Sequence, residues 1–267
     1  MKGEIMINET TNDETGYLTA QGEITYNMTN DYMFRVILQE NDIVLRSLIC
    51  SLLRLKPDSI SSVKVTNPII LGENINDKTF VLDVNVIMND HAVINLEMQM
   101  QDNGNWTDRA LHYLCRNFNK LQKGDDYLET KPVVHIGFLN YNLFPEHPEF
   151  YARYQMQNIK SHYLFSSKMM IGVVNLNQIE IATDEDQFYG LDEWVALFKS
   201  KTWEELRMIA NEKPELLEAS KSLYQYNNEE TIRWQCWARE DYRRQMNTIE
   251  RDRKEYLAEN ARLKAEK

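Results

Sequence analysis

The pattern of hydrophobic and polar positions divides the chain into a helical start, a strand-rich middle and a helical end. Helical spacing predicts two early helices, one over YMFRVILQE that Thr29, Asn30 or Asp31 can cap, and one at about Ile43–Leu53. Six extended segments follow, in SSVKVTN, FVLDVNVIM, AVINLEMQM, VVHIGFL, EFYARYQMQ and MMIGVVNL. A helix at about Trp106–Gln122 interrupts them, and after Gly190 the spacing is helical to the end. This order predicts an α/β fold, with a mixed sheet flanked by helices.

The end of the chain has the pattern of one long, solvated helix. Residues 228–267 contain 10 Lys and Arg against 9 Asp and Glu, and neither Gly nor Pro. Seven positions recur there at alternating steps of four and three, namely Tyr242, Met246, Ile249, Arg253, Tyr256, Asn260 and Leu263. This is coiled-coil spacing, made impure by one Arg and one Asn. Two interpretations stay open: a coiled coil that forms a homodimer or higher oligomer, and a lone helix that packs on its own domain.

Length and composition then limit the class of protein. The chain has 267 residues, 43% of them hydrophobic and 27% charged, as in ordinary globular proteins. We expect four parts: a polar segment at 1–21, a domain at 22–189, a helical region at 190–227 and the charged helix at 228–267. No apolar run is long enough for a membrane helix, and the acidic, polar start is unlike a signal peptide. Three widely separated cysteines fit a reducing compartment, so we expect a cytoplasmic protein without a membrane partner.

The net charge of the chain argues against nucleic acid as a partner. The formal charge of the chain is -11, and residues 1–227, with 20 basic and 32 acidic residues, hold -12 of it. A field of this sign repels nucleic acid. Motifs for nucleotide hydrolysis, dinucleotide redox chemistry, serine esterases and zinc proteases are also missing from the sequence.

The candidate chemistry lies on the second and third predicted strands. The period-2 rule places Asp83 on one face of FVLDVNVIM, and Glu97 and Gln99 on the polar face of AVINLEMQM. Asp83 lies directly opposite Glu97 only if the connection is the three residues 89–91; a two-residue turn would separate the carboxylates. Opposed carboxylates repel, and a cation such as Mg²⁺ or Mn²⁺ would neutralise them. The alternative is that both are ordinary solvent-facing residues of a one-sided hairpin.

The spacing of Asp83, Glu97 and Gln99 resembles the core of the PD-(D/E)XK nucleases, with Gln99 at the position where that pattern has lysine. Three flanking segments strengthen the likeness: TNDYMFR ahead, Arg109-x-x-x-Tyr113 behind, and LQKGDDY at the end of the helix. Together they resemble the Rpn family of recombination-promoting nucleases and transposases. This resemblance implies a restriction-endonuclease-like fold and metal-dependent hydrolysis of DNA phosphodiesters.

The resemblance also implies roles for particular residues. Asp83 and Glu97 would hold Mg²⁺ or Mn²⁺, and Gln99 would orient the attacking water without the positive charge that a lysine supplies. Arg109 and Tyr113 share a helix face and could reach a phosphate, whereas a surface ion pair and a core position are their respective alternatives. Asp31 could add a carboxylate or only cap its helix. The expected function is a DNA endonuclease of recombination or transposition; the alternative is a weak or inactive nuclease fold that assembles through its coiled coil.

Overall fold

Two capped helices precede the sheet in the computed structural model, which describes residues 16–69, 83–211 and 213–265. The first, α2 (Asp31–Glu40), is capped by the side chain of Asn30, and α3 (Asp42–Leu53) is capped in the same way by Asn41. The interpretation of Asp31 as the cap is therefore wrong, because its carboxylate stands in the first turn, where it faces the positive end of the helix dipole.

The sheet is mixed, as the sequence predicted, so the α/β fold class is confirmed. Its six strands are ordered β1-β2-β3-β4-β6-β5. Their bounds are β1 Val63–Val65, β2 Val84–Met88, β3 Ala92–Gln99, β4 Val133–Leu139, β5 Tyr151–Gln157 and β6 Leu164–Asn175. The β3–β4 and β4–β6 pairs are parallel, and the remaining pairs are antiparallel. Of the predicted segment FVLDVNVIM, residues 80–82 lie outside the described ranges.

Two boundaries differ from the prediction by four residues or more. β6 begins at Leu164, well before the predicted run MMIGVVNL, because its first half pairs with β5 in a long hairpin. That half carries polar residues, which hid its strand character. The helix between β3 and β4, α4, covers Trp106–Phe118 and ends four residues early.

Five helices form the rest of the chain. They are α5 Asp184–Phe188, α6 Leu191–Lys199, α7 Trp203–Ala210, α8 Pro214–Asn228 and α9 Glu230–Ala265. Three short 3-10 helices lie at Pro57–Ser59, Tyr127–Glu129 and Ile179–Ile181. None of the described helices combines the length and the apolarity that crossing a membrane requires.

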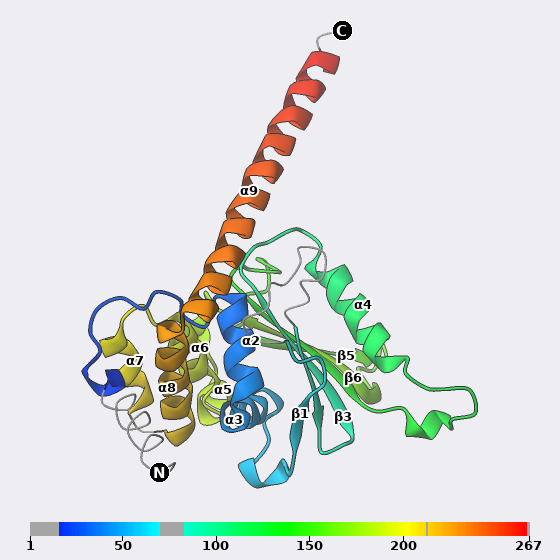
Figure 1. The fold of residues 1–267 in the computed structure, drawn as a ribbon. Helices are drawn as coiled ribbons and strands as arrows, with labels where there is room; N and C mark the ends of the chain where they lie inside the picture. The colour runs from blue at the N-terminus through cyan, green and yellow to red at the C-terminus, as the bar shows by residue number, and fades with distance from the viewer. Residues whose placement is uncertain (1–15, 70–82, 212, 266–267) are drawn as a thin grey trace.

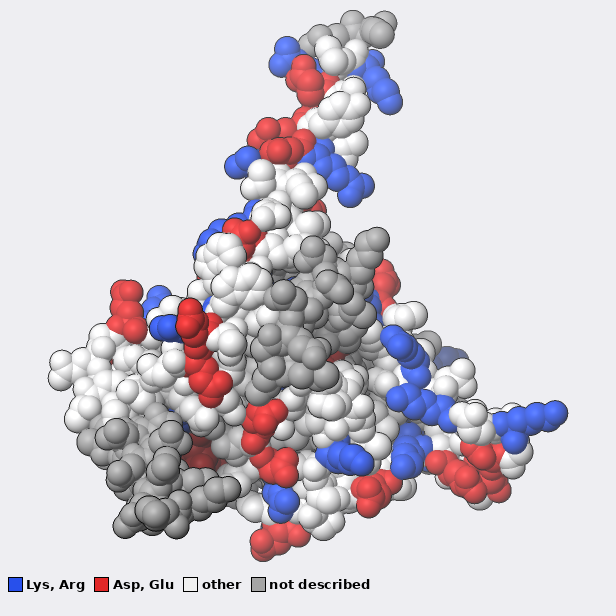
Figure 2. Space-filling model, viewed as in Figure 1, with Lys and Arg blue, Asp and Glu red and all other residues white. Residues whose placement is uncertain are grey.

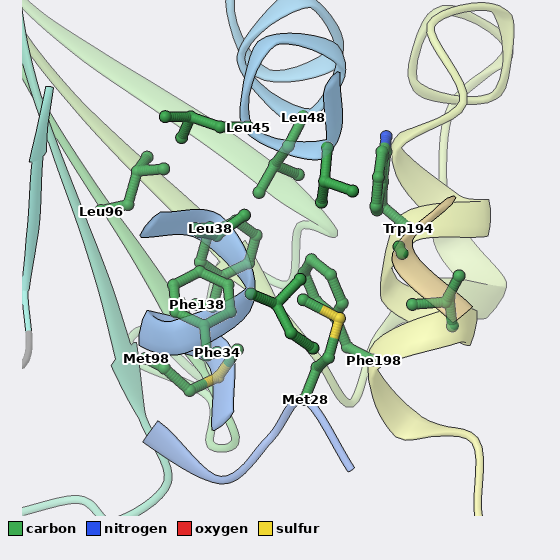
Figure 3. Close-up of a cluster of buried hydrophobic side chains, with 14 of the residues drawn as sticks. Met28, Phe34, Leu38, Leu45, Leu48, Leu96, Met98, Phe138, Trp194 and Phe198 are labelled. Atoms are coloured by element: carbon green, nitrogen blue, oxygen red, sulfur yellow. The ribbon is translucent and has the colours of Figure 1, made fainter. Parts of the chain in front are cut away.

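One core joins the sheet to helices from both ends of the chain. Figure 3 shows Phe34 of α2 beside Phe138 of β4 and Phe198 of α6. Their rings meet edge to face, with centroids 5.4 Å apart for Phe34–Phe138, 5.7 Å for Phe34–Phe198 and 5.5 Å for Phe138–Phe198. The same core extends from Tyr17 to Cys236. The helices after residue 190 therefore pack on the sheet domain and share its hydrophobic interior.

The burial of Tyr17 shows that the predicted polar segment at 1–21 includes a residue of the hydrophobic core. Residues 1–15 of that segment lie outside the described ranges, but residues 16–19 are helical and Tyr17 is only 2% exposed. Part of the segment is thus packed into the core.

The terminal helix α9 is packed at its base and projects from the body along the rest of its length (Figure 1). Ile232 and Cys236 near its start are fully buried. From Tyr242 onward its hydrophobic side chains are exposed. At 1.5 Å per residue its 36 residues span about 54 Å.

Candidate functional site

The hairpin of β2 and β3 brings two carboxylates together. The register pairs Val84 with Leu96 and Met88 with Ala92. The predicted three-residue connection is confirmed, and Asn89 and Asp90 within it adopt the left-handed conformation, with φ of 52° and 54°. One step before β2, Asp83 comes opposite Glu97, and the two side chains share one face of the sheet. The carboxylates therefore belong to one buried site.

Both carboxylates are withdrawn from water. Asp83 is 6% exposed and Glu97 is 4% exposed, which excludes the alternative of solvent-facing hairpin residues. Burial, and next the charge of Glu97, raise the pKa of Asp83 to about 6. His135, Arg109 and a hydrogen bond from Asn95 act in the opposite direction and stabilise its charged form.

The two carboxylates fit a divalent cation. Oδ2 of Asp83 and Oε2 of Glu97 are buried without a hydrogen-bond partner among the described residues. A buried charge that lacks such partners is costly, and a hard cation satisfies it with oxygen ligands. In the described ranges, no group of three or more His, Cys, Asp or Glu side chains is arranged to bind a metal ion. A cation here would complete its shell with backbone oxygens, water or substrate.

Arg109 and Gln99 form the open side of the site. The guanidinium of Arg109, on α4, donates through Nη2 to Oε1 of Glu97 and through Nη1 to Oε1 of Gln99, the latter over 3.4 Å. The Gln99 amide nitrogen donates to the carbonyl oxygen of Gln101 over 2.8 Å. The side chain of Gln99 is thus held at both ends, beside the carboxylate pair.

Tyr113 lies one turn after Arg109 on α4 and contacts His135, which is buried beside the carboxylates. Its ring stacks on that of His135, with centroids 6.0 Å apart and 17° between the planes. Burial and the nearby carboxylate of Asp83 raise the pKa of the Tyr113 hydroxyl. Tyr113 is half-buried, so it is neither a simple core residue nor a freely exposed one.

Sequence reasoning missed His135 and Asn95. His135 is fully buried, with Nε2 at 3.5 Å from Oε2 of Glu97, and Asn95 is 1% exposed beside Asp83. Parallel pairing of β3 with β4 sets Asn95 opposite His135 and so brings both onto the carboxylate face. The sequence does contain a sign of both residues, because each is a polar residue inside an apolar strand. Burying such a residue costs free energy unless it has a hydrogen-bond partner.

Arg35 was also missed as part of the site. This arginine of α2 is fully buried and donates to the carbonyl oxygens of Asp83 and Asn67. Nδ2 of Asn67 donates to the same Asp83 oxygen over 2.9 Å. The backbone that carries the first carboxylate is therefore held from two sides.

Asp31 does not join the carboxylate pair. Both of its oxygens accept from Nε of Arg239 on α9, over 3.2 and 3.1 Å. Asp31 lies instead on the wall of an open cleft beside Gln99 and Arg109. Its observed role is to tie α2 to α9.

Gly137 makes room for the helix that carries Arg109. It lies opposite Glu97 in β4, and a Cβ at this position would overlap the indole ring of Trp106 at the start of α4. We expect Gly137→Ala to destabilise the protein by about 1–3 kcal/mol, because the ring and α4 must shift. Urea unfolding measures this loss. Trp106→Phe should remove most of the overlap, so a double variant that is no more stable than the additive sum of the single variants would contradict the explanation.

Comparison with known proteins agrees with this geometry. The family model described as PD-(D/E)XK nuclease family transposase matches residues 28–264. No curated protein and no solved structure gives a significant match. The matched range contains the carboxylate hairpin, α4 and nearly all of α9, and it covers most of the chain. The chain therefore belongs to the PD-(D/E)XK nuclease family of transposases.

Proposed function

We propose that this protein is a metal-dependent DNA endonuclease that hydrolyses phosphodiesters in recombination or transposition. The observation that carries the proposal is the buried, opposed pair Asp83 and Glu97. Each has one oxygen without a hydrogen-bond partner among the described residues, and Arg109, which pairs with Glu97, lines an open cleft. A pair of this kind stabilises the fold poorly and suits a cation well. Membership of a nuclease family supports the same class of reaction.

Each residue has a role that follows from its chemistry. Asp83 and Glu97 would hold Mg²⁺ or Mn²⁺, which, when bound, polarises a phosphate oxygen and lowers the pKa of a bound water. Gln99 would orient that water through its held amide. Because an amide carries no charge, Arg109, which donates to Gln99, would supply the positive charge that stabilises the phosphate. Tyr113 and His135 would keep bulk water from the inner side of the pair.

The proposal extends to assembly. Five exposed apolar residues follow the coiled-coil spacing along α9, namely Tyr242, Met246, Ile249, Tyr256 and Leu263. Pairing of this helix with a second copy would bury part of this stripe and make a homodimer, with two sites for two strands. A cytoplasmic location completes the proposal and rests on the cysteine usage.

Nicking of a supercoiled plasmid tests the function. The parent protein should nick DNA in Mg²⁺ or Mn²⁺ and stop in EDTA. Glu97→Gln should remove nicking because it removes a ligand charge, whereas Asp58→Asn, at an exposed position in the 3-10 helix Pro57–Ser59, should leave nicking unchanged. If the folded parent protein does not cleave, or Glu97→Gln cleaves equally well, the alternative of an assembly module is the better one. The net charge of -12 in residues 1–227 and the missing lysine at Gln99 favour that alternative.

A further inference from the structure

The terminal helix forms one wall of the cleft that opens beside the carboxylate pair. The cleft has a volume of about 630 Å³ and is lined on one side by Gln99, Arg109 and the residues that follow β3. Its other side is formed by residues of α9 between Arg239 and Arg253. Figure 1 shows α9 rising from the body next to α2 and past the segment between β3 and α4. Elements more than a hundred residues apart in sequence therefore meet at the cleft.

The charge of this cleft is opposite to that of the whole chain. Its lining has four arginines and two acidic residues, namely Arg109, Arg239, Arg243 and Arg253 with Asp31 and Glu250. The chain as a whole carries -11. All four cations are arginine and none is lysine, and arginine is the side chain best shaped for bidentate bonds to phosphate. Figure 2 shows basic and acidic side chains mixed along the projecting part of α9, so the cleft differs from the exposed helix above it.

Two of the four arginines make no close ion pair with the described residues. Arg239 is bonded to Asp31, and Arg109 is bonded to Glu97. Arg243 is 3.9 Å from Glu240, which is a loose pair, and its side chain is one-third exposed. Arg253 is exposed, and its side chain has no ion pair or hydrogen bond with any described residue. Arg243 and Arg253 both lie on α9, on the side of the cleft opposite Gln99 and Arg109.

The remaining lining fits a nucleic-acid strand. The residues after β3 contribute neutral amides at Gln101, Asn103 and Asn105, which can bond to phosphate or base. Tyr242 contributes an aromatic ring that is 39% exposed, with the guanidinium of Arg239 at 5.8 Å from the ring centre. Cations that follow a backbone, next to an aromatic ring, are the usual components of a strand-binding groove.

We propose that the cleft is the substrate channel and that α9 is its second wall, with Arg243 and Arg253 binding phosphates of the DNA strand that leads to Asp83 and Glu97. This inference rests on the proposed nuclease function and adds to it the residues that position the substrate. It gives the part of α9 between Arg239 and Arg253 a role in substrate binding that is separate from self-association. Since Tyr242, Met246, Ile249 and Arg253 belong to the coiled-coil stripe and also line the cleft, a dimer that leaves the cleft open would use the stripe beyond Arg253.

DNA binding without cleavage tests the inference. The probes are a fluorescent 20-nucleotide DNA, single-stranded and as a duplex, titrated in EDTA at several salt concentrations with fluorescence anisotropy as the readout. Arg243→Ala/Arg253→Ala should weaken binding of the preferred probe at least tenfold and make the salt dependence shallower by about 2 units, because two phosphate contacts are lost. The matched control is Arg244→Ala/Arg262→Ala, which removes the same charge from α9 at residues that do not line the cleft.

The outcomes separate this inference from the proposed function. Equal binding by the cleft variant and the parent protein would overturn the inference, and so would equal weakening in the control variant or no binding of either probe by the parent. Plasmid nicking by the parent that depends on Glu97 would support the nuclease function in each of those cases. Weaker DNA binding in the cleft variant alone, together with plasmid nicking that Glu97→Gln leaves unchanged, would support the substrate channel and reject the proposed catalytic site.

Discussion

Asp83→Asn is expected to make the metal-free protein more stable above pH 6 and at the same time to abolish metal-dependent cleavage. The folded protein raises the pKa of Asp83 from 3.8 to about 6, so between these values it binds more protons than the unfolded chain. Stability therefore falls as pH rises through that window, and the loss is complete above it. A shift of this size corresponds to a loss on the order of 2–3 kcal/mol. Asparagine has nearly the same shape but no charge, so the variant avoids that loss.

Thermal unfolding in EDTA between pH 4 and pH 8 measures this effect. The parent and Asp83→Asn proteins should have similar midpoints near pH 4 and diverge as the pH rises, with the variant more stable. The exposed carboxylate variant Asp58→Asn should follow the parent at every pH. Mg²⁺ should raise the midpoint of the parent and leave that of Asp83→Asn unchanged, since only the parent retains both ligands. A parallel pH dependence in the two proteins would contradict the electrostatic argument.

Arg35→Met is expected to cost about 3 kcal/mol of stability. The Arg35 guanidinium is fully buried, and it satisfies the carbonyl oxygens of Asp83 and Asn67. Burial lowers its pKa to about 10, while the carboxylate of Asp83 opposes that shift, so it stays charged at neutral pH. Methionine fills much of the same volume, but it leaves the carbonyl oxygen of Asn67 without this donor and that of Asp83 with Asn67 in place of two donors.

Urea unfolding checks the stability of Arg35→Met, and nicking assays at a temperature where the variant is folded check its function. Cleavage should fall as well, because the backbone that carries Asp83 loses one of its two supports. Arg35→Lys keeps a charge and a donor but reaches only one carbonyl well, so it should lie between the parent and Arg35→Met. A loss of less than 1 kcal/mol in Arg35→Met would show that Asn67 alone holds this segment.

The carboxylate pair could be predicted from sequence because it depends on local rules. Period-2 alternation and the length of one turn determine whether Asp83 and Glu97 face each other, and both can be read from twenty consecutive residues. His135 and Arg35 could not be placed in this way. His135 reaches the site through a parallel pairing with β3, and Arg35 reaches it from a helix that packs across the sheet, so their positions depend on tertiary contacts.

Charge shows a second limit of sequence reasoning. The total of -11 argued against nucleic acid, yet the structure collects four arginines at one cleft. A sum over the chain cannot reveal this, because Arg109 and Arg243 belong to segments that come together only in the fold. Helical periodicity predicted α9 well, but which of its faces meets the body is decided by its packing on α2 and α8.

The shared core has a consequence for the order in which the protein is made. α2 is among the first elements to leave the ribosome, yet its hydrophobic face packs against residues as late as Ile232 and Cys236. Arg239, which holds Asp31, follows Cys236 by about one turn. The nascent chain therefore carries both carboxylates long before it can close its core or form the second wall of the cleft. The core and the cleft can therefore be completed only when synthesis of α9 is under way, and a chain interrupted before α9 would lack these late core residues and one wall of the cleft.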